Sequence, residues 1–248
     1  MTYEEWKQRW GMSLTPQQEA AVQADQGPVL LLAVPGSGKT TVLVLRLGYL
    51  LFCRHVPPES ILTVTYTVAA TQDMRARFAG FFGQEAAARL EFRTINGLSA
   101  RIIRYYEQVR GRQAFTLMTN EGKLSALLRE LCRQATGEFA SESTIKALRT
   151  AITYIKNQQL TVAEIEAIQV DGLPVARIYR DYCAALHRQG WMDYDDQMVY
   201  AARILRQYGE ILAEFQKRYP YLCVDEAQDT SKIQHTILRL LAGCAGTI

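Results

Sequence analysis

The chain has few of the residues that build metal clusters and disulfide frameworks. It contains only five cysteines and three histidines in 248 residues, no two cysteines form a CxxC pair, and no histidine stands at ligand spacing. Structural zinc sites and iron–sulfur clusters need such closely spaced ligands. The sequence therefore supports neither, and we expect the cysteines to be free thiols in a reducing compartment.

Strong charge and long apolar segments are also missing. The formal net charge is +3, which is too small to indicate a nucleic-acid partner by itself. The acidic start Met1–Trp6 has no apolar signal core, and the apolar stretch Val42–Phe52 is interrupted by Arg46 and too short to span a bilayer. We therefore expect a cytoplasmic protein with no membrane partner.

A glycine-rich loop lies directly after the apolar run Val29–Leu32. Between a strand and a helix, such a loop wraps backbone N–H groups around a phosphate chain. Its lysine reaches the terminal phosphates and its threonine hydroxyl is available to Mg²⁺. The predicted phosphate-binding residues are Ala33, Val34, Pro35, Gly36, Ser37, Gly38, Lys39 and Thr40.

The loop departs from the strict pattern at its start. Ala33 stands where that pattern has Gly, whereas Gly36, Gly38, Lys39 and Thr40 are all present. The alternative is a chance Gly-rich turn before a buried helix. A strand-like run before the loop and a long helical stretch after it favour the phosphate loop.

Two adjacent carboxylates follow a second strand-like run. Tyr221–Val224 leads into Asp225-Glu226-Ala227-Gln228-Asp229-Thr230. Mg²⁺ accepts one or two carboxylates and keeps most of its waters, so Asp225 suits the metal and Glu226 suits an attacking water. The two motifs together predict an ATP-hydrolysing site.

Strand-like and helix-like segments alternate along the first half of the chain, which predicts a parallel sheet. The predicted strand and helix pairs are Val29–Leu32 with Gly38–Phe52, Ile61–Tyr66 with Ala69–Phe82, and Leu90–Ile95 with Gly97–Gln108. A mostly helical block then runs from about Thr119 to Gln216, before the strand Tyr221–Val224. We therefore expect one α/β domain (1–112 and 203–248) with an inserted all-α domain (113–202).

Two groups of polar residues have competing interpretations. Trp191–Asp196 contains three carboxylates, but Asp193 as an N-cap with Asp196 in the first turn explains them better than a metal site. Gln18 fits a capping box with Thr15 and Pro16, yet its amide could also pair with the edge of adenine. Spacing alone leaves both roles of Gln18 open.

The ordered motifs resemble those of UvrD/Rep/PcrA-type superfamily 1 DNA helicases. The resemblance rests on four segments and covers essentially the whole chain: Leu14–Ala21, Thr63–Thr67, Arg93–Leu98 and Val224–Thr230. It implies a RecA-like P-loop NTPase domain with a helical insertion, the first of two motor domains in an ATP-dependent helicase that moves 3′ to 5′ on DNA.

The resemblance also implies a role for each motif residue. Gln18 would recognise adenine, Lys39 and Thr40 would hold phosphate and Mg²⁺, and Thr41 would lie beside the nucleotide. Asp225 would hold the metal, Glu226 would be the catalytic base and Gln228 would sense the γ-phosphate. Single-stranded or 3′-tailed duplex DNA would contact Thr65, Tyr66, Thr94 and Asn96.

The chain departs from the family at several of these positions. Family members commonly have Phe-Thr-Asn-Lys where this chain has Tyr66–Ala69, a His in place of Asn96, and an Arg in place of Thr41. The absence of that Lys and of the His removes two potential DNA contacts. Tyr66 has the alternative role of packing at a strand end.

The family plan continues beyond this chain with a second motor domain, which supplies arginines to the transferring phosphoryl group. Such arginines are worth roughly 10³ or more in rate, so we expect this segment alone to hydrolyse ATP barely. Two alternatives are the motor segment of a helicase–nuclease subunit and a P-loop ATPase that does not unwind DNA.

Overall fold

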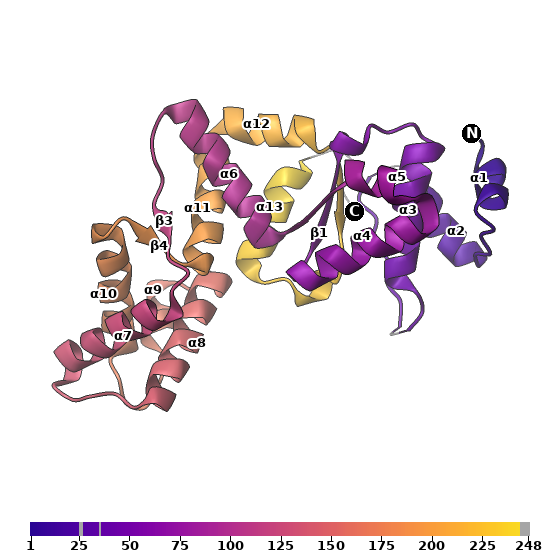
Figure 1. The fold of residues 1–248 in the computed structure, drawn as a ribbon. Helices are drawn as coiled ribbons and strands as arrows, with labels where there is room; N and C mark the ends of the chain where they lie inside the picture. Colours follow the sequence, from indigo (N-terminus) through magenta and orange to yellow (C-terminus); the bar gives the residue numbers. More distant parts are fainter. Residues whose placement is uncertain (25–26, 35, 244–248) are drawn as a thin grey trace. The chain divides into compact units, whose positions relative to one another are not determined.

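The structure, a computed structural model, describes residues 1–24, 27–34 and 36–243 (Figure 1). Its contacts divide the chain into two compact units. The sheet unit comprises Met1–Leu98, Tyr208–Thr230 and Leu238–Ile248. The helical unit comprises Ser99–Gln207 and Ser231–Ile237. Helices α6 (Ile95–Arg110) and α13 (Lys232–Ala242) each continue from one unit into the other.

Three parallel strands form the sheet, in the order β2-β1-β5. They are β1 (Ile61–Thr65), β2 (Glu91–Thr94) and β5 (Tyr221–Val224). Every residue of β1 is buried, as a central parallel strand covered on both faces requires. The prediction of a parallel α/β sheet that resumes after the helical block is therefore confirmed for these three strands.

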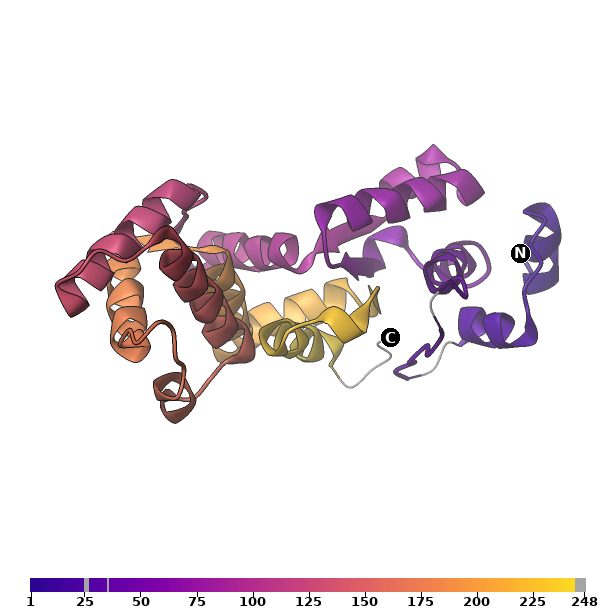
Figure 2. The ribbon, with the colours of Figure 1, turned by 90° about the horizontal axis from the view of Figure 1, so that it is seen from below.

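Helices surround the sheet and supply most of its core. Those wholly in the sheet unit are α1 (Tyr3–Arg9), α2 (Pro16–Gln23), α3 (Lys39–Phe52), α4 (Val68–Phe82), α5 (Gln84–Arg89) and α12 (Gly209–Arg218), with short 3₁₀ turns at Pro58–Ser60 and Ala227–Asp229. Helix α4 packs on β1, β2 and α3, while α1 and α2 lie against α3 (Figure 2). Trp6, Leu47 and Phe78 are fully buried in this core.

The strand predicted at Val29–Leu32 is wrong. The described segment 27–34 is irregular, and Leu30 and Leu32 are 75% and 81% exposed. A strand forms only where a neighbouring strand satisfies its N–H and C=O groups. Among the described strands, β1 lies between β2 and β5, and none pairs with this segment.

The helical unit is built from five helices of its own together with parts of α6 and α13. Its own helices are α7 (Glu121–Thr136), α8 (Glu142–Gln158), α9 (Val162–Glu166), α10 (Val175–Arg188) and α11 (Tyr194–Gln207). Leu124, Leu128 and Leu131 of α7 are buried in its core, and their spacing of three to four residues places them on one face of the helix. None of the described helices is long and apolar enough to cross a membrane.

Two short strands in the helical unit were not predicted. β3 (Thr116–Leu117) and β4 (Trp191–Met192) pair in parallel. A strand of two residues shows no alternation of polar and apolar side chains, so the sequence carries no signal for it. The pair joins the segment that leads into α7 to the segment that leads into α11.

We predict that Gly48→Ala destabilises the sheet unit. A Cβ on Gly48 would lie 2.1 Å from Phe82 Cζ, and the Phe82 ring is held by Trp6, Phe52 and Phe78. Overpacking of this kind typically lowers the free energy of unfolding by ~1–3 kcal/mol. Urea denaturation measures it. In the control Gly80→Ala, nothing lies within 4 Å of the new Cβ, so equal losses in both variants would contradict the prediction.

Candidate nucleotide site and neighbouring strand ends

Two glycines shape the loop that was predicted to hold phosphate. Gly36 (φ 80°) and Gly38 (φ 84°) lie in the left-handed region, which side chains with a Cβ adopt only with strain. Between them, Ser37 turns back on the chain, and its N–H and Oγ donate to the Val34 carbonyl at 3.2 and 2.7 Å. Pro35 lies outside the described residues. The loop therefore makes a tight turn just before α3.

Helix α3 starts from this loop with open amides. Its N-cap is Gly38, which has no side chain to cap the first turn. The first N–H groups of a helix have no intrahelical partner and carry the positive end of the helix dipole, which makes them an anion site. Lys39 lies at the first position of the helix, with Nζ 3.5 Å from the Ala33 carbonyl, and Thr40 and Thr41 follow it.

Gln18 lies beside the loop. The predicted capping box of α2 is confirmed, because Thr15 Oγ1 accepts from the Gln18 N–H and Gln18 Oε1 accepts from the Thr15 N–H at 3.0 Å. The amide nitrogen of the same side chain is 3.5 Å from the Ser37 carbonyl. Gln18 thus caps its helix and touches the loop at once, and its contact with adenine stays a prediction.

Asp225 and Glu226 lie at the end of β5. The Asp225 N–H donates to the Val64 carbonyl at 3.0 Å, which extends the ladder between β5 and β1. Glu226 then turns into the left-handed region (φ 50°), an uncommon conformation for a residue other than glycine. Gln228 Nε2 donates a hydrogen bond to the Glu226 carboxylate. The turn therefore brings the Gln228 amide to the Glu226 carboxylate.

Charged residues of both motifs act on Asp225. Burial and the neighbouring Glu226 charge raise the pKa of Asp225, while the charges of Lys39 and Arg77 act to lower it. Lys39 therefore lies within electrostatic range of Asp225, although the two are far apart in sequence. Arg77 was not predicted from the sequence, because its local signal is only the helical ion pair with Asp73, at 2.7 Å.

The residues around Asp225 fit a Mg²⁺ ion that also binds water and phosphate oxygens better than a metal ion whose ligands all come from the protein. Asp225 and Thr40 offer hard oxygen ligands, which Mg²⁺ prefers together with water and phosphate oxygens. Among the described residues, no group of three or more His, Cys, Asp or Glu side chains could hold a metal ion. Nucleotide and water oxygens would therefore have to complete such a site.

The predicted DNA-binding residues lie at the ends of two neighbouring strands. Thr65 of β1 and Thr94 of β2 are paired in register. Both hydroxyls have local partners, since Thr65 Oγ1 donates to the Thr67 carbonyl and Thr94 Oγ1 accepts from the Gly97 N–H. Tyr66 is 57% exposed, whereas Asn96 Oδ1 is buried with no hydrogen-bond partner among the described residues.

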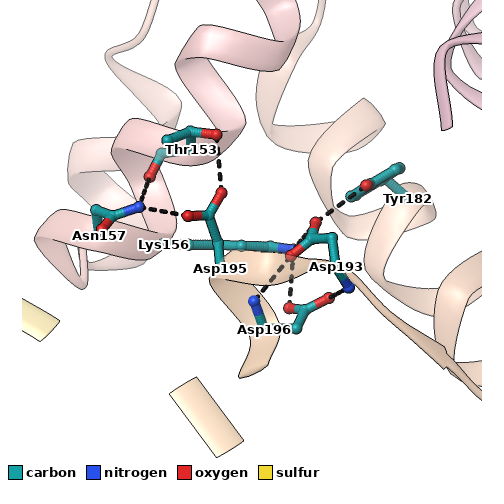
Figure 3. Close-up of polar contacts among 7 residues, drawn as sticks. All are labelled: Thr153, Lys156, Asn157, Tyr182, Asp193, Asp195 and Asp196. Carbon is teal, nitrogen blue, oxygen red and sulfur yellow. Dashed lines mark hydrogen bonds and ion pairs between the residues drawn. The ribbon is translucent and has the colours of Figure 1, made fainter. Parts of the chain in front are cut away.

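The acidic stretch Trp191–Asp196 forms a buried ion pair in the helical unit (Figure 3). As the sequence predicts, Asp193 caps the first turn of α11: its carboxylate accepts from the Asp196 N–H at 2.8 Å, and Asp196 accepts from the Asp193 N–H at 3.3 Å. Lys156 Nζ of α8 lies 2.6 Å from Asp193 and 2.8 Å from Asp196. Sequence analysis missed Lys156, because nothing in its own segment marks a buried lysine.

Burial and charge act against each other in this cluster. Burial alone would raise the pKa of Asp193, but the charge and hydrogen bond of Lys156 hold it below its usual value. The pKa of Asp196 is raised, because burial and the Asp193 charge outweigh Lys156. Tyr182 also donates to Asp193, at 3.0 Å. The carboxylates are therefore occupied by a lysine, which leaves a metal ion without a role here.

A parallel sheet, a glycine loop at a helix start and carboxylates at a strand end are typical of nucleotide-binding α/β domains. The family model described as UvrD/REP helicase N-terminal domain matches residues 14–247. The chain therefore belongs to the UvrD/REP helicase family and corresponds to its N-terminal domain.

The relatives include proteins named ATP-dependent DNA helicase PcrA. The one from Staphylococcus epidermidis is 31% identical over 233 residues, which cover 93% of this chain and 32% of that protein. The one from Staphylococcus aureus is 30% identical over 232 residues, which cover 92% of this chain and 31% of that protein. The chain thus spans about a third of the length of these relatives.

We predict that Lys156→Met strongly destabilises the helical unit, because two facing buried carboxylates lose their counter-charge. Removing one partner of a buried ion pair costs ~3–5 kcal/mol of unfolding free energy. Without Lys156, burial raises the folded-state pKa of both aspartates above the unfolded value, so the loss shrinks as the pH falls from 7 toward 4. Urea denaturation at both pH values measures this.

The control is Lys146→Met, which changes an exposed lysine on the same helix. It should cost less than about 0.5 kcal/mol. A Lys156→Met loss as small as that of the control, or one that does not change with pH, would contradict the prediction.

Proposed function

We propose that this chain is the ATP-binding first motor domain, RecA-like and with an inserted helical domain, of an ATP-dependent helicase that moves 3′ to 5′ along single-stranded DNA. The observation that carries the proposal is the meeting of the two motifs. The Lys39 charge acts on Asp225, which supports a single site formed by the loop at the start of α3 and the end of β5. The family and the names of the relatives support ATP as the nucleotide and DNA as the track.

Each group in the site has a task in ATP hydrolysis. The open amides at the start of α3 and the Lys39 ammonium bind the phosphates. Thr40 and Asp225 would hold Mg²⁺, which would neutralise part of the phosphate charge. Glu226 accepts a proton from the attacking water and Gln228, bonded to Glu226, senses the γ-phosphate. Gln18, beside Ser37, pairs with adenine.

The DNA path runs over the ends of β1 and β2. In parallel α/β sheets, ligands gather outside the carboxyl ends of the strands, and Thr65 and Thr94 are the last residues of theirs. Exposed Tyr66 offers an aromatic face on which a base stacks without regard to sequence. The neighbouring polar groups contact the backbone of single-stranded or 3′-tailed duplex DNA.

We infer that efficient turnover requires more than this segment. The chain spans about a third of the length of the PcrA relatives, and the arginines that stabilise phosphoryl transfer are assigned here to a second motor domain. The segment alone should therefore hydrolyse ATP barely. The experiments below accordingly use the full-length protein.

We predict that Lys39→Ala and Glu226→Gln fail in different ways. Lys39→Ala removes a phosphate ligand, so both ATP binding and turnover should be lost. Glu226→Gln removes the base but keeps the shape and the metal ligand, so ATP should still bind while turnover falls about 10²–10⁴-fold. Fluorescent-nucleotide binding and phosphate release distinguish the two. Normal turnover in Lys39→Ala, or equal loss of binding in both variants, would overturn these roles.

We predict that Tyr66→Ala weakens single-stranded DNA binding about tenfold or more, because a stacked base is typically worth ~1–3 kcal/mol. DNA-stimulated hydrolysis should fall, while ATP binding without DNA survives. Fluorescence titration at matched salt measures the affinity. The control is Phe139→Ala, which removes an 88% exposed aromatic ring from the helical unit. Equal affinity of Tyr66→Ala and wild type would make Tyr66 a packing residue.

A further inference from the structure

Helix α2 is held in place by contacts with three segments: the nucleotide loop, α1 and α3. At its start, Gln18 Nε2 lies 3.5 Å from the Ser37 carbonyl. On one side, Glu19 pairs with Lys7 of α1 at 2.6 Å. At its end, the Ala21 and Val22 carbonyls accept hydrogen bonds from Arg46 of α3. An eight-residue helix is too short to be stable alone, so these contacts decide its position.

Arg46 is the buried member of this set. It is 5% exposed, and its Nη1 lies 3.1 Å from the Val22 carbonyl and 3.3 Å from the Ala21 carbonyl. Carbonyls in the last turn of a helix lack intrahelical donors and carry the negative end of the dipole. The last turn of α2 has no basic residue of its own. The guanidinium of α3 therefore serves as the C-terminal cation of α2.

The same guanidinium reaches toward the strand that carries Asp225. Burial raises the pKa of the Cys223 thiol on β5 to about 11, and the Arg46 charge acts against this rise. One buried cation thus contacts the end of α2, and its charge acts on Cys223 of β5, from a position two turns along the helix that begins at the loop. These three elements contribute Gln18, Lys39 and Asp225.

We propose that Arg46 is a positioning residue that sets the preference of the site for adenine. Its hydrogen bonds fix the end of α2 to α3. This position of α2 holds Gln18, near its other end, against the loop. The Gln18 contact with Ser37 is at the long limit of a hydrogen bond, so a small tilt of α2 breaks it. This inference rests on the proposed function, because it needs Gln18 to face the base.

The experiment measures how ATP, GTP and inorganic tripolyphosphate displace a fluorescent ATP analogue from the full-length protein. Arg46→Met and Arg46→Lys are compared with wild type and with Arg89→Met, which changes an exposed arginine on α5. A neutral hydrogen bond such as one between the Gln18 amide and adenine is worth up to about a tenfold change in affinity. We expect Arg46→Met to lose about tenfold in ATP affinity, with GTP and tripolyphosphate changed less than about twofold, and Arg46→Lys to lie between it and wild type.

A readout independent of nucleotide is the hydrogen exchange of the backbone amides. In Arg46→Lys, which keeps the charge, α2 amides should exchange faster while those of α3 and β1 keep their protection. If ATP and tripolyphosphate affinities fall together, or if α2 exchange is unchanged, Arg46 supports only the core and the inference is overturned. If wild type itself shows no preference for ATP over GTP, the proposed adenine role of Gln18 fails first.

Discussion

The pairing of β1 with strands on both sides is the constraint on which the site depends. β1 is completely buried, and its parallel register with β2 and β5 brings the ends of three strands to one edge of the sheet. Asp225 continues the β5 ladder through its bond to Val64, so its carboxylate is placed by backbone pairing. Because parallel strands all point the same way, one edge collects groups from distant parts of the chain.

Backbone conformation and side-chain charge both shape the candidate site at that edge. Gly36 and Gly38 turn the loop, and the uncapped start of α3 offers N–H groups to an anion. Lys39 and Asp225 then place opposite charges within range of each other. The left-handed Glu226 adds a strained turn at the point where β5 ends, which is where functional residues commonly store strain. The candidate site is thus polar, has a strained turn at Glu226, and is held in place by the paired strands of the sheet.

The helical unit uses a different device to define its packing. Lys156 of α8 is matched to two aspartates at the start of α11, and Tyr182 of α10 donates to one of them, so removing Lys156 would leave buried charge where these three helices meet. Nearby, Asn157 donates to Asp195 at 2.7 Å and accepts from the Ser231 hydroxyl at 2.9 Å. The chain that leaves the Asp225–Thr230 segment is therefore tied to α8 as soon as it enters the helical unit.

The sequence by itself determined the elements whose signals are local. The glycine loop, the Thr15 and Asp193 caps, the helical spacing of α7 and the carboxylates after Tyr221–Val224 all depend on neighbours within a few residues. The tertiary structure decided the rest. The apolar run Val29–Leu32 did not form a strand, because strand formation depends on a pairing partner that no local pattern encodes. Lys156 looks like an ordinary surface residue in the sequence, and Arg46 only interrupts an apolar stretch; the packing of distant helices gives each the buried partners that make its charge stable there.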